Sequence, residues 1–357
     1  MISWVLAAAL ALPGARSDLA LPPEPATLMA VPAELRDRMQ SQVIEPGRGE
    51  HQRLQRLLRF LSDDEPGLAM LYNDGATQSV ADAYLNRQAN CVTYTMLFLS
   101  LAQQAGLDAY PQEIEETLAW QQRDGIVYRT NHVNAGVRIG THRYTVDVGI
   151  GFVMARHPAH RISTQRLLAQ YYNNHAAMLM SGQQMESALA YARTALELDP
   201  DYPITWSNTG VIRLHDGDPE GARRDYETAL RLDPDNAAAL FNLVGLYQRS
   251  GNRELEHSYR RRLDKVQQAD PFHQFLLADE YERQGNAALA IRHYQRAIGL
   301  HGSEHRFHYG LARAFLLAGN HRRALRALER ALSLSHDEAS RNLYREKMAE
   351  LSGEVSR

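Results

Sequence analysis

A regular repeat in the second half of the chain constrains the fold more than any other feature. Two short motifs that end in Asp-Pro close at Pro200 and Pro234, and a third such motif reaches Pro271. Repeat starts at positions 169, 203, 237, 271 and 305 give five units of equal length, without insertion or deletion. A period of this length predicts an array of stacked helical units that bury one continuous core.

Small residues recur near the eighth, twentieth and twenty-seventh positions of the units, where helices are expected to cross closely. The three sets are Ala176, Gly210, Val244, Ala278 and Ala312; Ala188, Ala222, Glu256, Ala290 and Ala324; and Ala195, Ala229, Leu263, Ala297 and Ala331. The third unit departs from the pattern, because it places Glu256 and Leu263 at two of these positions. The departure falls in its second helix, so this hairpin is expected to be longer than the others or splayed.

The second unit resembles the tetratricopeptide (TPR) repeat. The residues that carry the resemblance are Trp206, Gly210, Gly217, Ala222, Tyr226, Ala229 and Pro234. The resemblance implies an all-α superhelical solenoid of five TPR repeats over residues 169–338. A C-terminal capping helix and tail are predicted for residues 339–357, where apolar residues alternate with many charges.

TPR arrays bind protein or peptide ligands on a concave face, and the resemblance implies such a partner here. Asn174, Asn208 and Asn242 occupy the same position of three successive units, on the predicted concave face. Their amides could hydrogen-bond a peptide backbone, so they are candidate peptide-binding residues. The alternative is that asparagine is simply common at this position of the repeat.

Residues 33–161 show a different pattern, of helices followed by strands. Apolar spacing predicts a helix around Leu54–Leu61 and another around Val80–Tyr84. A nearly continuous apolar run predicts a buried helix from Cys91 to about Gln104, with Asn90 as N-cap and Gly106 as the stop. Strands are predicted at residues 109–114, 132–139 and 143–148, as an antiparallel meander.

The order of Cys91, His132 and Asp147 along these elements suggests nucleophilic chemistry. A cysteine that opens a helix lies at the positive end of the helix dipole, which favours thiolate over thiol. A histidine on a following strand could take its proton, and a carboxylate on the next strand could fix the imidazole tautomer. Each residue alone is more often structural, so the three gain weight only together.

The stretch NCVTYTMLFLSLAQQAGLDAY, with the later NHVNAGV and YTVDVG, resembles the transglutaminase-like domain of bacterial proteins, which has a papain-like Cys-His-Asp triad. The resemblance implies an α+β transglutaminase-like domain over residues 33–161. It makes Cys91 the nucleophile, His132 the general base and Asp147 the orienting carboxylate. Many relatives have Arg-Gly-Asn-Cys where this chain has Gln88-Ala89-Asn90-Cys91. The oxyanion hole would use the Cys91 backbone N–H and an upstream donor, for which Gln88 is the candidate.

Composition excludes several other classes of protein. The net charge of −3 gives no reason to expect nucleic acid as a partner, and a single cysteine excludes an internal disulfide or a thiolate zinc site. The chain has no Walker loop, G-x-G-x-x-G element or HExxH motif, so we predict no cofactor and no metal. His301, His305 and His308 lie close together in sequence, and a metal site there is the less favoured alternative.

The N-terminus has the pattern of an export signal. An apolar run covers Ile2–Leu12, and the small residues around Arg16 predict cleavage before Asp18. Residues 1–17 are therefore predicted to be a signal peptide, which makes the mature protein periplasmic or secreted; the alternative is a cytoplasmic protein with a buried N-terminal helix. Residues 18–32 are rich in proline and predict an extended linker. No run is long enough for an integral membrane segment.

The two halves together predict an exported thiol acyl-transfer enzyme of the peptidase, deamidase or transglutaminase type. Its triad would act on a protein or peptide that the TPR array presents. The sequence leaves open whether water or an amine resolves the thioester, although hydrolysis is favoured because bacterial relatives more often hydrolyse. The alternative is a non-catalytic TPR adaptor in which the transglutaminase-like domain is inactive.

Overall fold

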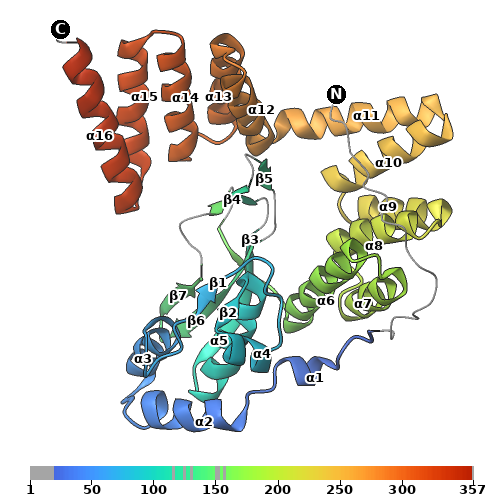
Figure 1. Ribbon diagram of the computed structural model, residues 1–357, viewed down its shortest axis with the longest axis vertical. Helices are drawn as coiled ribbons and strands as arrows, with labels where there is room; N and C mark the ends of the chain where they lie inside the picture. Colours follow the sequence, from blue (N-terminus) through green and yellow to red (C-terminus); the bar gives the residue numbers. More distant parts are fainter. Residues whose placement is uncertain are drawn as a thin grey trace.

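The computed structural model describes residues 20–114, 117–123, 126–128, 132–148, 153–155 and 158–355. The predicted signal peptide at residues 1–17 lies outside the described residues. The N-terminal part combines helices and strands, and it packs beside the first helices of a curved array of helix hairpins (Figure 1). In the described part of the chain, no helix has both the length and the apolar character needed to cross a bilayer.

The helices of the N-terminal part surround a central buried helix, α5. The central helix α5 covers Cys91–Gln104. The elements before it in sequence are α1 (Pro25–Leu28), α2 (Ala33–Met39), the π-helical turn η1 (Gln40–Ile44), α3 (Glu50–Ser62) and α4 (Val80–Asn86). The prediction for α5 is confirmed, because the Asn90 side chain accepts a hydrogen bond from the Thr93 N–H and most of the helix is buried. The expectation of an extended linker over residues 18–32 needs correction, since α1 lies within it and its Leu28 is buried in the core.

Three groups of strands complete the N-terminal part. The main sheet is antiparallel, with order β7-β6-β3-β9, and contains β3 (Asp108–Ile114), β6 (His132–Ile139), β7 (His142–Val146) and β9 (His160–Arg161). A second sheet, not predicted from the sequence, has order β5-β4-β8, with β4 (Thr117–Arg123), β5 (Ile126–Tyr128) and β8 (Val153–Ala155). A short parallel pair joins β1 (Leu71–Tyr72) to β2 (Gln88–Ala89) just before α5.

Antiparallel hairpins of helices form the array. The first helices are α6 (Thr164–Ser181), α8 (Pro203–His215), α10 (Ala237–Ser250), α12 (Pro271–Arg283) and α14 (His305–Leu317). The second helices are α7 (Met185–Leu198), α9 (Pro219–Leu232), α11 (Arg253–Ala269), α13 (Ala287–Leu300) and α15 (His321–Leu334), and α16 (Glu338–Val355) follows them. α6 begins before position 169 because Ser163 caps it, with its hydroxyl accepting from the Arg166 N–H.

The turn inside each hairpin contains one residue in the left-handed conformation. Four of these residues are glycines with φ from 70° to 87°, and they occupy the same position of four successive units, at Gly217, Gly251, Gly285 and Gly319. Glycine adopts this conformation without steric cost, which ends the first helix and allows the second to fold back. In the first hairpin the equivalent residue is Gln183, with φ of 60°.

The small residues of the repeat lie where the helices cross. Ala222 and Ala229 are fully buried, and a side chain at Gly210 would come within 2.5 Å of the Tyr226 ring. The departure of the third hairpin shows in its second helix, because α11 has 17 residues and each of the other second helices has 14. Leu263 is the one described side chain of α11 that is buried.

The buried apolar residues of the described part of the chain form three clusters. The first cluster joins the N-terminal part to α6 and α7 and reaches Ile212 on α8. The second cluster runs from Ala222 to Leu263 and joins α9, α10 and α11. The third cluster runs from Phe272 to Leu351 and joins α12 to α16. The first hairpin of the array therefore shares its apolar core with the N-terminal part, whereas the later hairpins are divided between two other clusters.

Candidate functional site

Cys91 is the first residue of α5, and its thiol is free and half-buried. The residue before it, Asn90, is held on several sides. The Asn90 amide donates to the Thr77 hydroxyl at 2.7 Å, and its backbone N–H donates to the Ala76 carbonyl at 3.2 Å. The Asn90 side chain also accepts from the Thr93 N–H at 3.0 Å. These contacts fix the start of α5, so Cys91 lies at the positive end of a well-anchored helix dipole.

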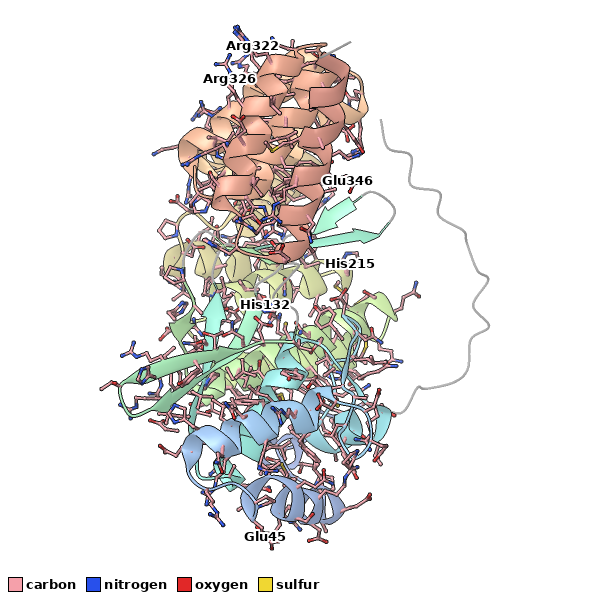
Figure 2. The ribbon with its side chains drawn as sticks, turned by 90° about the vertical axis from the view of Figure 1, so that its left-hand side faces the viewer. Glu45, His132, His215, Arg322, Arg326 and Glu346 are labelled. Carbon is pink, nitrogen blue, oxygen red and sulfur yellow. The ribbon has the colours of Figure 1, made fainter. Side chains whose placement is uncertain are left out.

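His132 and Asp147 lie side by side next to this helix start. His132 Nε2 is 2.6 Å from Asp147 Oδ2, and the Cys91 side chain is close enough to His132 to raise the pKa of the imidazole. His132 is the first residue of β6, and Asp147 directly follows β7, which ends at Val146 rather than at the predicted Val148. The structure thus brings together the three residues that the sequence selected. Figure 2 shows His132 well inside the molecule, far from Glu45 and Arg322 at its two ends.

Asn134 is a polar partner of the site that sequence reasoning missed. Its amide donates to Asp147 Oδ2 at 3.1 Å, and its side chain is almost fully buried. The signal was present in the sequence, because residues i and i+2 of a strand share a side and His132 is two residues earlier. Asn134 therefore helps hold the carboxylate against the imidazole.

The surroundings of His132 raise the pKa of its imidazole. Burial lowers its pKa, but the hydrogen bonds to Asp147 and Cys91, together with their negative charges, raise the pKa overall to about 10. The imidazole therefore holds its proton at neutral pH. A protonated imidazole between a carboxylate and a sulfur atom is suited to stabilise a thiolate and to protonate a leaving group.

Gln88 lies in β2, three residues before Cys91, and is half-buried. Its carbonyl oxygen Oε1 accepts a hydrogen bond from the Asn73 amide at 2.7 Å. This contact fixes one end of the Gln88 amide and leaves its nitrogen as a donor. The structure gives no bond from that nitrogen to the site, so its role in an oxyanion hole stays a prediction.

Two tyrosines lie close to the site. Tyr72 in β1 is 39% exposed, so its side chain can be reached from solvent. Burial of the rest of the side chain raises its pKa, and a hydrogen bond with Asp74 and the charges of Cys91 and Asp147 raise it further. Tyr94 on α5 is buried, which raises its pKa to about 12, and the Asp147 charge contributes. Both phenols therefore remain neutral hydrogen-bonding groups near the site.

The first hairpin of the array contacts the loop that supports Cys91. His175 on α6 lies near the backbone of Thr77, which acts to raise the pKa of the imidazole, and the Thr77 hydroxyl binds Asn90. The His175 ring packs between Tyr171 and Tyr191, with centroid distances of 4.5 Å and 5.5 Å. Burial lowers the pKa of His175, so the ring is neutral.

A buried carboxylate makes a second link between the two halves. Glu113 on β3 is 1% exposed and accepts hydrogen bonds from Tyr202 at 2.8 Å and from Gln170 at 3.1 Å. Arg166 on α6 lies 3.7 Å from its other oxygen. Because Glu113 pairs with Val133 in the sheet, next to His132, the array is attached to the strand that holds the imidazole.

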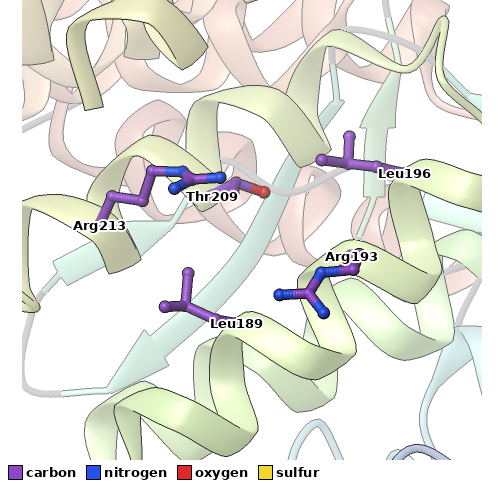
Figure 3. A pocket seen from close by; sticks show the side chains of 5 residues that line it. All are labelled: Leu189, Arg193, Leu196, Thr209 and Arg213. Carbon is purple, nitrogen blue, oxygen red and sulfur yellow. The ribbon is translucent and has the colours of Figure 1, made fainter. Parts of the chain in front are cut away.

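The predicted peptide-binding asparagines differ in their contacts. Asn208 donates to Asn173 at 3.0 Å, so its amide is already engaged. Asn174 and Asn242 are partly exposed and make no side-chain hydrogen bond to another described residue. A small cavity of about 90 Å³ lies between α7 and α8 and is lined by Leu189, Arg193, Leu196, Thr209 and Arg213 (Figure 3). Binding on a concave face remains a prediction.

The histidines near residue 305 are engaged in structural contacts. His305 Nδ1 lies 2.7 Å from the Tyr344 hydroxyl, and His308 Nε2 lies 3.1 Å from the Gly302 carbonyl. Among the described residues, no group of three or more histidine, cysteine, aspartate or glutamate side chains has the arrangement of a metal site.

Comparisons with known proteins identify the repeats. Family models for the tetratricopeptide repeat match residues 169–202, 213–254 and 275–341. The chain therefore contains TPR repeats, and its C-terminal part is a helical TPR-type solenoid. No curated protein sequence matches the chain significantly.

Several solved structures are similar to part of the chain. MamA from Desulfovibrio magneticus RS-1 has 19% identity and a TM-score of 0.27, with 46% of this chain and 94% of that chain covered. YrrB, described as a TPR protein with an unusual peptide-binding site, has 21% identity and a TM-score of 0.27, with 50% and 92% covered. PilF from Pseudomonas aeruginosa has 16% identity and a TM-score of 0.30, with 54% and 87% covered.

Proposed function

We propose that the chain is a protein-binding adaptor whose TPR array takes a peptide segment of its partner. The observation that carries this proposal is the set of regularly spaced helix hairpins, which TPR family models match in three places. Such arrays expose an extended surface that binds peptides. The matched residues all lie in the array, which favours the adaptor function over a purely catalytic one.

A displayed peptide library selected on the whole chain tests this proposal. We expect enriched peptides to lose at least several-fold in affinity when Asn174 and Asn242 are replaced by alanine, because their amides have no partner among the described residues. The matched control is Asn342→Ala, in α16, where the asparagine accepts from Arg345. Equal losses in both variants, or the absence of any enriched peptide, would contradict binding through these asparagines.

A second function, thiol acyl transfer in the N-terminal part, is favoured by the arrangement of Cys91, His132 and Asp147. In this proposal the N-terminal part is a transglutaminase-like domain. The Cys91 sulfur attacks a carboxamide or peptide carbonyl, and His132 gives its proton to the departing ammonia or amine. Asp147 and Asn134 keep the imidazole in place during both steps.

The thioester formed on Cys91 would then react with water or with an amine. Water attacks the thioester carbonyl, gives its proton to His132 and releases a carboxylic acid and the free thiol. An amine would instead form a new amide. We favour hydrolysis because the bacterial domains that this sequence resembles more often hydrolyse than cross-link.

Alkylation of Cys91 by iodoacetamide at pH 6 tests this second function. We expect Cys91 to react faster than free cysteine, and His132→Ala to slow the reaction at least tenfold, because the cation that stabilises the thiolate is lost. Asp147→Asn should slow it less. His215→Ala is the control, because His215 is exposed on α8 (Figure 2). If the unaltered chain and the three variants were all alkylated at the same slow rate, thiol acyl transfer would be contradicted and only the adaptor function would remain.

We also propose that the protein is exported and acts in the periplasm or outside the cell. This proposal is supported by the apolar run at Ile2–Leu12 and the small residues that precede Asp18. Mass spectrometry of the protein from its native host should find an N-terminus at Asp18. An intact Met1 in the cytoplasmic fraction would contradict it.

A further inference from the structure

Residues 20–25 (Ala-Leu-Pro-Pro-Glu-Pro), which we call the N-terminal strap, lie against the first hairpin of the array. The Ala20 N–H donates to the Ser187 hydroxyl at 3.0 Å. The Tyr191 hydroxyl donates to the Leu21 carbonyl at 3.3 Å, and the Tyr172 hydroxyl donates to the Pro23 carbonyl at 2.5 Å. Side chains of α6 and α7 thus bind the backbone of the strap at three successive points.

The surface under the strap is built for these bonds. Tyr172 is fully buried, and Tyr191 and Ser187 are more than nine-tenths buried. The two tyrosine rings pack together with centroids 6.0 Å apart. Burial raises the pKa of Tyr172 to about 12, and the nearby Glu24 carboxylate adds to the shift, so the phenol keeps the proton that it donates. Without the strap, these polar atoms would need another partner.

The strap has the composition of a polyproline segment, and its Glu24 has the matching backbone conformation. Three of its six residues are prolines, and Glu24 has φ of −62° and ψ of 141°, which is polyproline II geometry. Prolines lack an N–H, so their segments present mainly carbonyl oxygens and lose little entropy on binding. Aromatic side chains that donate hydrogen bonds to such carbonyls are the usual means of recognising proline-rich peptides.

We propose that Tyr172, Tyr191 and Ser187 form a binding site for extended proline-rich peptides, which the strap occupies within the same chain. This site uses two phenols and a hydroxyl of the first hairpin, and it does not include the asparagine amides, although Asn174 follows Tyr172 by two residues on α6. The strap continues into α1, whose Leu28 is buried, and the next carbonyl, that of Met29, accepts from Ser100 on α5. Residues 20–24 can therefore leave the site while α1 stays anchored, which lets a proline-rich segment of a partner take their place.

Binding of a fluorescent peptide with the sequence of residues 20–27 (ALPPEPAT) tests the proposal by anisotropy. The protein is the whole chain with residues 20–24 replaced by Gly-Ser-Gly-Ser-Gly. We expect this variant to bind the peptide, and the unaltered chain to bind it at least tenfold more weakly because the strap competes. A peptide with alanine at the three prolines should bind at least several-fold more weakly than the original peptide.

Tyr191→Phe in the strap-replaced chain should weaken peptide binding about fivefold to tenfold, which corresponds to one hydrogen bond. Tyr281→Phe, in α12 of the same array, is the matched control and should change nothing. If the replaced strap impairs folding, Pro22→Gly with Pro23→Gly changes only two strap residues and should give intermediate binding. No binding by either folded variant, or equal binding of both peptides, would overturn the proposal.

Discussion

The first hairpin and the last hairpins of the array have similar helices but belong to different cores. α6 and α7 share one apolar cluster with α5 and the main sheet, whereas α12 to α16 form a cluster of their own. Between them lies the long helix α11 (Figure 1). Among its described side chains, Leu263 is the one that is buried. A regular repeat in sequence therefore does not imply equal coupling to the rest of the chain.

This difference has a functional consequence. The first hairpin contacts the support of Cys91 through His175, and Glu113 links it to the sheet that holds His132. Among the described residues, the buried apolar cluster of α12–α16 contains no residue of the N-terminal part. Changes in the first hairpin should therefore reach the candidate active site, whereas changes in α12–α16 should stay local.

The largest expected change in the free energy of unfolding is in the apolar cluster of α12–α16, which we call the C-terminal cluster. Phe307 on α14 is fully buried, with its ring 5.2 Å from that of Phe275. Phe307→Ala should lower the free energy of unfolding of this cluster by about 3–5 kcal/mol, because it removes a packed ring and leaves a cavity. Hydrogen exchange should rise in α12–α16 and stay unchanged in α5 and α6.

The control for this prediction is Leu317→Ala, at a position that is 48% exposed on the same helix. It should change stability by no more than about 0.5 kcal/mol. If Phe307→Ala also raised exchange in α5, the two clusters would unfold as one unit and the comparison would fail.

The second prediction is that the stability of the N-terminal part and that of the C-terminal cluster depend on pH in opposite directions. The pKa of His132 is raised from 6.5 to about 10, so the folded N-terminal part binds the proton more tightly than the unfolded chain. Its contribution to the free energy of unfolding is complete below pH 6.5 and is lost as the pH rises through about 10. Urea unfolding of the N-terminal part from pH 6 to 10.5 should show this loss, and His132→Gln should remove it.

The C-terminal cluster should respond to pH in the opposite direction. Burial lowers the pKa of His305 and His308, so the unfolded chain binds their protons more tightly. This cluster should therefore lose stability as the pH falls below about 6.5. The same pH trend in both clusters would show that these histidines do not control their stability.

The third prediction concerns the link through Glu113. Glu113→Ala should cost about 2 kcal/mol, because Tyr202 and Gln170 lose a buried acceptor. The isosteric Glu113→Gln keeps an acceptor oxygen and should cost less. Both costs should be seen in thermal unfolding of the N-terminal part together with α6 and α7. Loss of stability confined to the array would contradict a shared core.

The smallest effect is expected in α11. Glu256 accepts from Arg260 at 2.7 Å one turn later, on a helix that faces solvent along most of its length. Glu256→Ala should change the free energy of unfolding by about 0.5 kcal/mol or less, as is usual for such a pair. A loss above about 1.5 kcal/mol in chemical denaturation would show that α11 is a tightly packed part of the array.

The sequence predicted best what is local and periodic. The bounds and cap of α5 follow from Asn90 and an apolar run, and the hairpins follow from alanines and glycines at a fixed spacing. His132 and Asp147 were found because they belong to segments with clear strand character. The contacts that no local pattern encodes were missed, including the second sheet, the docking of the strap and the approach of His175 to the Thr77 backbone.

The identical turns of the hairpins make the length of the array adjustable during evolution. Four equivalent turns contain a glycine with positive φ, at Gly217, Gly251, Gly285 and Gly319. An in-frame duplication of one whole repeat after Gly217 would therefore create only turns of a kind that the array already has. Such a change would lengthen the surface without a new turn. The first hairpin, with Gln183 in the strained position and its helices in the N-terminal core, cannot be duplicated in this way. Variation in repeat number among descendants of this gene should therefore accumulate toward the C-terminal end.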